Sequence, residues 1–158
     1  MSDMLVKLYD LPEMDSLVRK LEDHGIIVRL ARAYEKHLIV EWVQNSFGEG
    51  WASECDVAFS NRPISCFIAT ETGKIIGFAC YESTCKDFFG PTGVIEAKRG
   101  MGIGKLLLLS SLHAMAANVY AYGIIGRVGP ADYYAKSVGA TIIEGSSLGI
   151  YRDRLKKK

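Results

Sequence analysis

The chain has 158 residues, of which 49% are apolar, and a formal net charge of +1 from 19 basic and 18 acidic side chains. This length and composition predict one globular domain over residues 1–158 rather than a disordered chain. The near-neutral charge argues against nucleic acid as a partner. We find no apolar run long enough to span a membrane and no signal peptide, which predicts a cytoplasmic protein without membrane contact.

The cysteine pattern predicts reduced thiols and no metal. No pair among Cys55, Cys66, Cys80 and Cys85 has the two-residue spacing of zinc or redox sites. Cys66 and Cys80 lie in strand-like apolar runs, so we expect them to be core residues.

The first part of the chain is mostly helical in pattern. A strand is expected over residues 4–9 and a helix between Pro12 and Gly25, with apolar residues at helical spacing. The apolar run 26–30 fits either a helix or a strand. Two further helices are expected over residues 34–45 and 51–60.

Beyond Pro63 the pattern changes to strands. Residues 65–70 and 74–83 flank the hairpin loop at 71–73. The later elements are expected to be strand 88–95, a long helix over 103–122, strand 123–128, helix 130–138, strand 140–144 and a last strand at 148–151. A hairpin followed by strand–helix–strand predicts an α/β (α+β) fold, with a mixed sheet and a parallel crossover through the long helix.

The most informative segment is Arg99-Gly-Met-Gly-Ile-Gly-Lys105, between a predicted strand and the long helix. Glycines let the backbone approach a ligand closely, and a helix start offers unpaired N–H groups and a positive dipole end. This combination is suited to binding phosphate. A Walker loop is excluded by its spacing and by Leu106, which stands where that loop has Ser or Thr. The dinucleotide-binding spacing is absent too.

Arg99, Gly102 and Gly104 have the spacing Arg-x-x-Gly-x-Gly. This resembles the acetyl-coenzyme A signature of the GNAT superfamily of N-acetyltransferases. Residues 94–109 resemble that family's strand–loop–helix motif, and the element order is similar over essentially the whole chain. The resemblance implies a mixed central sheet with splayed central strands flanked by helices, acetyl-coenzyme A as cosubstrate, and a small-molecule amine as partner. It leaves open a homodimer formed through edge strands.

The resemblance also assigns the coenzyme-binding residues. The loop backbone would hold the coenzyme pyrophosphate, through Arg99, Gly100, Met101, Gly102, Ile103, Gly104 and Lys105. Backbone groups of Val94 and Ile95 would pair with the pantetheine arm like an added strand. A backbone N–H near Val94 would polarise the thioester carbonyl.

Acid and base candidates follow from the same resemblance. Tyr134 is the expected acid for the leaving thiolate, with Tyr133 as the alternative, because Tyr134 lies five residues before Gly139, one more than is usual in the family. Asp87 and Glu82 are the two candidates for the general base. A second departure is Gly129-Pro130, where many relatives have an Asn that contacts the coenzyme.

The expected activity is transfer of an acetyl group to the primary amine of a small acceptor by direct attack in a ternary complex. Some members of the branch that this chain resembles acetylate amino sugars such as glucosamine; peptide N-termini, polyamines and aminoglycosides stay open as acceptors. The regions that line the acceptor site in this fold contain Tyr34, His37, Trp42, Trp51, Glu54, Ser146, Ser147 and Tyr151. The alternative function is a non-catalytic regulatory module that binds acetyl-coenzyme A.

Overall fold

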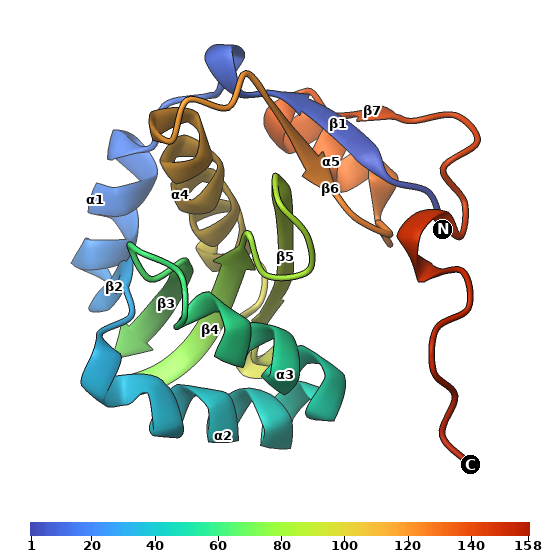
Figure 1. Cartoon of the computed structure of the whole chain (residues 1–158). Helices are drawn as coiled ribbons and strands as arrows, with labels where there is room; N and C mark the ends of the chain where they lie inside the picture. The colour runs from blue at the N-terminus through green and yellow to red at the C-terminus, as the bar shows by residue number, and fades with distance from the viewer.

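A computed structural model describes all residues, 1–158, and shows a seven-stranded sheet flanked by helices (Figure 1). The strands are β1 (Met4–Lys7), β2 (Ile26–Leu30), β3 (Cys66–Glu71), β4 (Lys74–Tyr81), β5 (Phe88–Val94), β6 (Tyr122–Ile125) and β7 (Thr141–Ile142). The α-helices are α1 (Asp15–Asp23), α2 (Lys36–Phe47), α3 (Glu49–Ala58), α4 (Ile103–Ala117) and α5 (Ala131–Val138). None of these helices combines the length and apolarity needed to cross a membrane.

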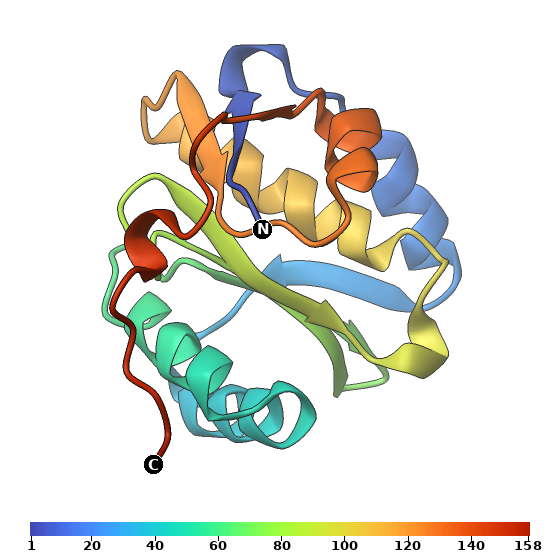
Figure 2. The same cartoon turned by 90° about the vertical axis from the view of Figure 1, so that its right-hand side faces the viewer.

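The sheet separates two hydrophobic clusters, one on each face (Figure 2). Helix α4 supplies seven of the 21 residues of the larger cluster, more than any other element, and its apolar residues surround nearly its whole circumference. Residues of α1, α5 and the strands supply the others. A helix that is apolar on all sides is one that the core encloses. Helices α2 and α3 cover the opposite face of β3 and β4 and form the smaller cluster.

Residue alternation along β3 and β4 explains why both faces are covered. Cys66 and Ile68 of β3 face the α2–α3 cluster, whereas Ala69 faces the α4 cluster. Because successive side chains of a strand point to opposite faces, an apolar strand of this kind needs a layer on each side. The alternation is interrupted in β4 at Ile76, where the pairing with β3 shifts register.

The strand order is β2-β3-β4-β5-β6-β1-β7. Pairs from β2 to β5 are antiparallel, and β5 and β6 are parallel neighbours joined through α4, so the predicted mixed sheet and its crossover are confirmed. The run 26–30 proves to be strand β2. The N-terminal strand β1 lies between β6 and β7. The edge strands are β2 and β7, and pairing of two copies along either edge stays a prediction.

Strands β5 and β6 pair over only two residue pairs, Phe88 with Ile124 and Phe89 with Ile125. Beyond Ile125 the chain turns toward the N-terminus, because the Arg127 N–H donates to Asp3 Oδ1 (2.7 Å) and the Val128 N–H donates to the Ser2 carbonyl (3.0 Å). The rest of β5 therefore has no neighbour on this side, and the predicted splay of the central strands is present.

Two predicted elements are wrong in part. The long helix ends at Ala117 rather than at residue 122, since the chain turns at Asn118 and at Val119, whose φ is 71°. The predicted strand at 148–151 is instead a 3₁₀ turn, Gly149–Tyr151, closed by a bond from the Tyr151 N–H to the Leu148 carbonyl (2.6 Å). Leu148 itself has a φ of 66°, which a strand does not accommodate.

Candidate functional site

The glycine loop leads into the start of α4 and lines a cavity there. Gly100 and Gly102 have φ values of 81° and 95°, the left-handed region that glycine adopts without strain. A Cβ on Gly102 would also lie 2.9 Å from Leu17 Cδ1. No side chain caps α4, so the first N–H groups of this helix stay free for a ligand.

A cavity of about 660 Å³ opens beside this loop, and we call it the coenzyme pocket after the ligand that the sequence leads us to expect. It lies between the loop, the far half of β5 and the start of α5. Gly104 faces it, because a Cβ there would meet nothing closer than Val94 Cγ2 (3.8 Å) and the Tyr133 hydroxyl (3.9 Å). A glycine at this position keeps the space between those two side chains open.

The unpaired edge of β5 forms one wall of the coenzyme pocket. The Ile95 N–H donates to the Ile76 carbonyl of β4 (3.0 Å), so backbone groups of Val94 face the other way, toward the splay. The Val94 carbonyl accepts a hydrogen bond from Arg99 Nε (3.1 Å). Val94 therefore presents its N–H to the pocket, whereas the N–H of Ile95 is already used.

Most residues assigned to coenzyme binding line this pocket. They are Val94, Arg99, Gly100, Gly102, Ile103, Gly104 and Lys105. Ile95 and Met101 do not: both pack against the larger hydrophobic cluster. The cationic group of Lys98, which sequence reasoning did not single out, also lines the pocket and pairs with Glu71 (2.9 Å).

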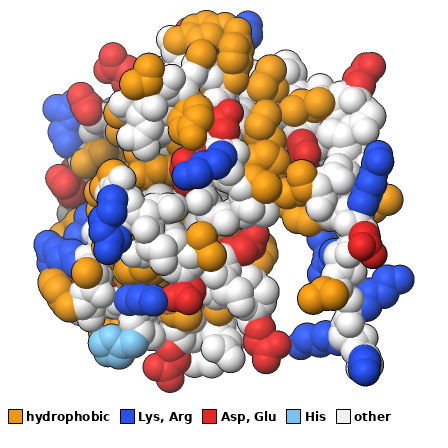
Figure 3. All heavy atoms as spheres, in the orientation of Figure 1, with side chains coloured by type: hydrophobic (Ala, Val, Ile, Leu, Met, Phe, Trp, Pro, Cys, Tyr) orange, Lys and Arg blue, Asp and Glu red, His pale blue; other side chains and the backbone are white.

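A second cavity, of about 640 Å³, adjoins the first along β5, and we call it the acceptor pocket after the second substrate that the sequence leads us to expect. Its walls come from α3, the start of β5, the segment after β6, and the C-terminal residues. Figure 3 shows an opening between the body of the molecule and its C-terminal segment, with Lys and Arg side chains along that segment. Tyr151 and Arg154 of this segment line the pocket, so the C-terminal residues complete it.

The two pockets meet at a small set of shared residues. Five side chains line both cavities: Trp51, Phe89, Thr92, Pro130 and Tyr134. A group bound in one pocket can therefore approach a group bound in the other only along this wall. The chemistry of a transfer between them falls to these residues and their immediate neighbours.

Tyr134 is the one ionisable side chain in the shared set. Its burial, together with the neighbouring Tyr133, raises the pKa of Tyr134 to about 12. The hydroxyl therefore keeps its proton at neutral pH and is available as a donor. Tyr133 packs against it with ring centroids 5.1 Å apart and lines the coenzyme pocket only.

Glu54 supplies a carboxylate to the acceptor pocket. It lies one turn after Trp51 on α3, and its Oε1 accepts a hydrogen bond from the Thr84 hydroxyl (2.5 Å). Thr84 itself lines the pocket. Sequence reasoning placed Glu54 in the acceptor region but had no signal for Thr84, which lies 30 residues away.

Asp87 and Glu82, the predicted base candidates, lie outside both pockets. They form the turn between β4 and β5, where both residues have positive φ and Glu82 Oε1 accepts the Asp87 N–H. Glu82 Oε2 also accepts a bond from the Tyr120 hydroxyl (3.1 Å). Burial and the nearby charge of Glu82 raise the pKa of Asp87 to about 6. The sequence indicated that these carboxylates lie near the start of β5, but it could not show that they lie outside both pockets.

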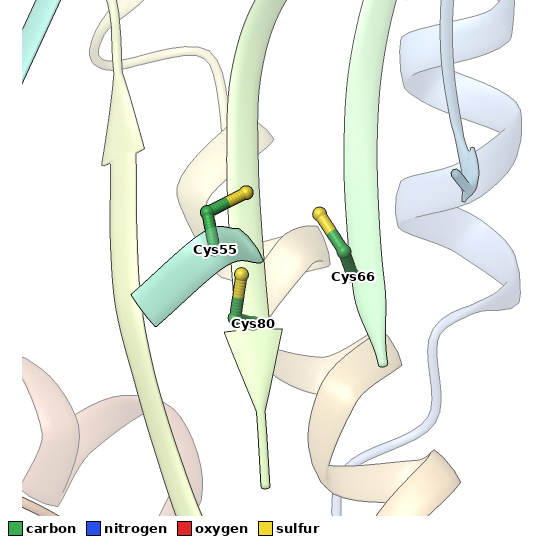
Figure 4. A group of neighbouring side chains, drawn as sticks. All are labelled: Cys55, Cys66 and Cys80. Atoms are coloured by element: carbon green, nitrogen blue, oxygen red, sulfur yellow. The ribbon is translucent and has the colours of Figure 1, made fainter. Parts of the chain in front are cut away.

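Three cysteines far apart in the sequence meet inside the smaller hydrophobic cluster. The sulfur atoms of Cys55, Cys66 and Cys80 lie within 4.8 Å of one another, brought together by α3, β3 and β4 (Figure 4). Three thiolates are ligands for a soft metal ion. However, a divalent ion with three thiolates would leave a negative charge in an apolar core. Burial raises the pKa of Cys80 well above its usual range, whereas hydrogen bonds with Cys66 and Cys80 lower the pKa of Cys55 to about 5. The surroundings therefore oppose the three thiolates that a metal ion would need, and the trio packs inside the smaller cluster.

Replacing Cys80 by Ser should destabilise the fold. The side chain is fully buried, so a hydroxyl there must lose water without gaining a strong partner, at about 1–3 kcal/mol of unfolding free energy. Urea unfolding of Cys80→Ser against wild type measures this loss. Cys85→Ser is the control because Cys85 is only half-buried and lies outside the trio. Equal stability of the two variants would contradict the packing role.

Asp87→Asn should stabilise the protein at alkaline pH but not at acidic pH. The folded carboxyl has a pKa of about 6, above the value of about 3.9 in an unfolded chain. Ionisation therefore costs folding free energy above about pH 6, and this cost disappears as the pH falls through 6 to below 3.9. Unfolding of both proteins at about pH 8 and at about pH 3.5, below both pKa values, measures the difference. Asp153→Asn, at an exposed position with positive φ, controls for the substitution itself.

Comparison with known proteins identifies the family to which the fold belongs. The model of the Acetyltransferase (GNAT) family matches residues 36–139, about two thirds of the chain. A search of curated proteins found no match.

Solved structures that resemble this chain include a GCN5-related N-acetyltransferase from Sphaerobacter thermophilus (TM-score 0.68, 20% identity, 90% of this chain and 48% of that chain). Another is a glucosamine N-acetyltransferase region in a fungal multi-domain GH3 β-N-acetylglucosaminidase (TM-score 0.73, 14% identity, 90% and 19%). A third is a GNAT-family acetyltransferase from Colwellia psychrerythraea (TM-score 0.60, 17% identity, 89% and 52%).

This chain spans about half or less of the length of these three chains, and at such identities the likeness concerns the fold. The family match covers the splayed strands, the glycine loop and the helix with Tyr134. The chain belongs to the GNAT family of acetyltransferases.

Proposed function

We propose that residues 1–158 form a single catalytic domain that transfers an acetyl group from acetyl-coenzyme A to the primary amine of a small acceptor, by direct attack in a ternary complex. The observation that carries this proposal is the meeting of the coenzyme and acceptor pockets at the wall that contains Tyr134. Direct transfer needs both substrates bound at once with their reacting atoms adjacent, and adjoining pockets supply that arrangement.

The residues present fit acetyl-coenzyme A. The glycine loop and the uncapped start of α4 offer N–H groups to a pyrophosphate, with the cationic side chains of Arg99 and Lys105 beside them. The bare edge of β5 offers backbone groups to an amide-containing arm, in the manner of an added strand. The coenzyme would supply a thioester, which is an acyl group already activated for attack by an amine.

The chain's own groups then have three tasks. The Val94 N–H faces the splay and would donate to the oxygen on which negative charge develops. The Tyr134 hydroxyl, which is protonated at neutral pH, would donate to the departing sulfur. Glu54 would orient the acceptor amine and accept its proton, directly or through water; we assign this role to Glu54 rather than to Asp87 or Glu82 because it alone of the three lines a pocket.

An amino sugar such as glucosamine is the acceptor that we would test first. Trp51, 38% exposed, and Tyr151 give the acceptor pocket aromatic surfaces beside the Glu54 carboxylate. Sugars commonly pack their apolar faces on aromatic rings while polar groups bind the hydroxyls. The similarity to the fungal glucosamine N-acetyltransferase region is consistent with this choice.

A non-catalytic module that binds acetyl-coenzyme A is the second candidate. It is favoured by the position of Asp87 and Glu82, the predicted bases, outside both pockets. The two functions differ in turnover: the purified protein releases free coenzyme A from acetyl-coenzyme A in the presence of an amine only if it is an enzyme. Binding without release across a broad amine screen would favour the module.

Gly104→Leu should abolish stabilisation by acetyl-coenzyme A. The new side chain would fill the space between Val94 and Tyr133 that a ligand needs. Leucine is a good helix former, so α4 itself should still fold. A ligand at about 100 times its Kd stabilises the folded state by about 2.7 kcal/mol, which thermal unfolding detects as a rise in Tm. Gly104→Ala is the control, because its single added carbon meets its neighbours at ordinary contact distances. A full rise with Gly104→Leu would exclude this pocket as the coenzyme site.

Tyr134→Phe and Glu54→Gln should each lower kcat by about 100-fold, the usual contribution of a general acid or base. Their KM for acetyl-coenzyme A should change little, since neither side chain is assigned to the pyrophosphate. Asp87→Asn and Glu82→Gln, outside both pockets, are compared in the same steady-state assay. If these two variants lose activity while Glu54→Gln stays active, the general base is Asp87 or Glu82 and not Glu54.

A further inference from the structure

We propose that the acceptor amine also carries an anionic group, a carboxylate or a phosphate, which Arg127 and Arg154 bind. This inference rests on the proposed acetyltransferase function and specifies the chemical class of its second substrate. It is carried by the distribution of charge around the acceptor pocket, which sequence reasoning did not anticipate.

Side chains of both charges line the acceptor pocket, and they come from different elements of the fold. Among side chains that line it, Glu54 is the one carboxylate, whereas Arg127 and Arg154 are the cations. Neither guanidinium takes part in an ion pair: the five pairs in the molecule involve other residues. Two unpaired guanidinium groups beside one cavity form a site for an anion, because arginine binds carboxylate and phosphate through paired N–H donors.

Arg127 is held in place by its surroundings. Its N–H donates to the buried Asp3 carboxylate (2.7 Å), which fixes the backbone after β6. Its guanidinium carbon lies 5.5 Å from the centre of the Tyr151 ring. Stacking on a ring occupies the face of a guanidinium and leaves its N–H groups, which point outward in the plane, free to bind an anion.

Arg154 comes from the C-terminal segment that closes the acceptor pocket. This segment is attached on one side through Tyr151, which faces Arg127, and on the other through Lys157, whose Nζ lies 3.0 Å from Glu49 Oε2 of α3. Arg154 lies between these two attachments. Its charge therefore borders the acceptor pocket.

Glu54 and the two arginines together select a ligand with two charges of opposite sign. An ammonium group suits the Glu54 wall on α3, close to Trp51 at the junction of the pockets. An anionic group of the same molecule suits the arginine wall. A polyamine or an aminoglycoside would instead bring a second cation against the arginines, so this arrangement argues against those two acceptor classes.

Two matched pairs of acceptors test the proposal and separate phosphate from carboxylate. One pair is glucosamine and glucosamine 6-phosphate; the other is 4-aminobutanamide and 4-aminobutanoate. We expect the anionic member of at least one pair to have a kcat/KM about 10- to 100-fold higher, and this preference should fall with added salt. Neutral members that are used as well as or better than anionic ones in both pairs would overturn the proposal.

Arg154→Gln identifies the group responsible. It should remove most of the preference for the anionic acceptor, so that the kcat/KM of the anionic member falls toward that of its neutral partner. Arg152→Gln, two residues away on the same exposed segment and outside the pocket, makes the same charge change and should keep the preference. A preference that survives Arg154→Gln in full would also contradict the assignment.

Stabilisation by acetyl-coenzyme A is measured first, so that failure of the function and failure of the inference are distinct. No rise in Tm with acetyl-coenzyme A would reject the acetyltransferase proposal itself. If the coenzyme binds but no acceptor is turned over, the same pairs are compared by their added effect on Tm with coenzyme A present. Equal effects of both members would overturn the anionic-acceptor proposal, and a larger effect of the anionic member would support it.

Discussion

The parting of β5 from β6 is the constraint on which both pockets depend. The two strands pair at Phe88 and Phe89 and then separate, because the chain after Ile125 bonds to Ser2 and Asp3 instead. Without that change of partner, β6 would continue along β5 and close the sheet. The N-terminal segment, remote in sequence from the glycine loop, thus keeps the site open.

An open strand edge has a free-energy cost that the rest of the fold must offset. Backbone groups without partners in an apolar cleft lose water and gain no hydrogen bond in return. Here β5 stays ordered because β4 pairs with its other edge and apolar layers cover both faces of the sheet. A bound ligand with amide groups would supply the missing hydrogen bonds, as proposed for the pantetheine arm.

Local patterns made much of this architecture predictable from sequence. A short continuous stretch of sequence is enough to predict the hairpin at residues 71–73, the glycine loop and the apolar helix after it. What local pattern does not contain is the direction of a side chain in a turn and the contact of distant segments. The position of Asp87 in a turn outside both pockets could therefore not be predicted from the sequence. Nor could the trio with Cys55, the Thr84–Glu54 bond or the place of β1 in the sheet.

Charge illustrates the same distinction between the whole chain and the site. A net charge of +1 gives little reason to expect a charged substrate, because fields of scattered surface groups are screened within about 10 Å. Recognition acts at contact distance, where two unpaired guanidinium groups on one wall outweigh the balance of the rest. The Glu54 carboxylate, on α3, adds a second preference, for a cationic group at the other end of the ligand. The pocket thus distinguishes the two ends of an acceptor although the molecule as a whole is almost neutral.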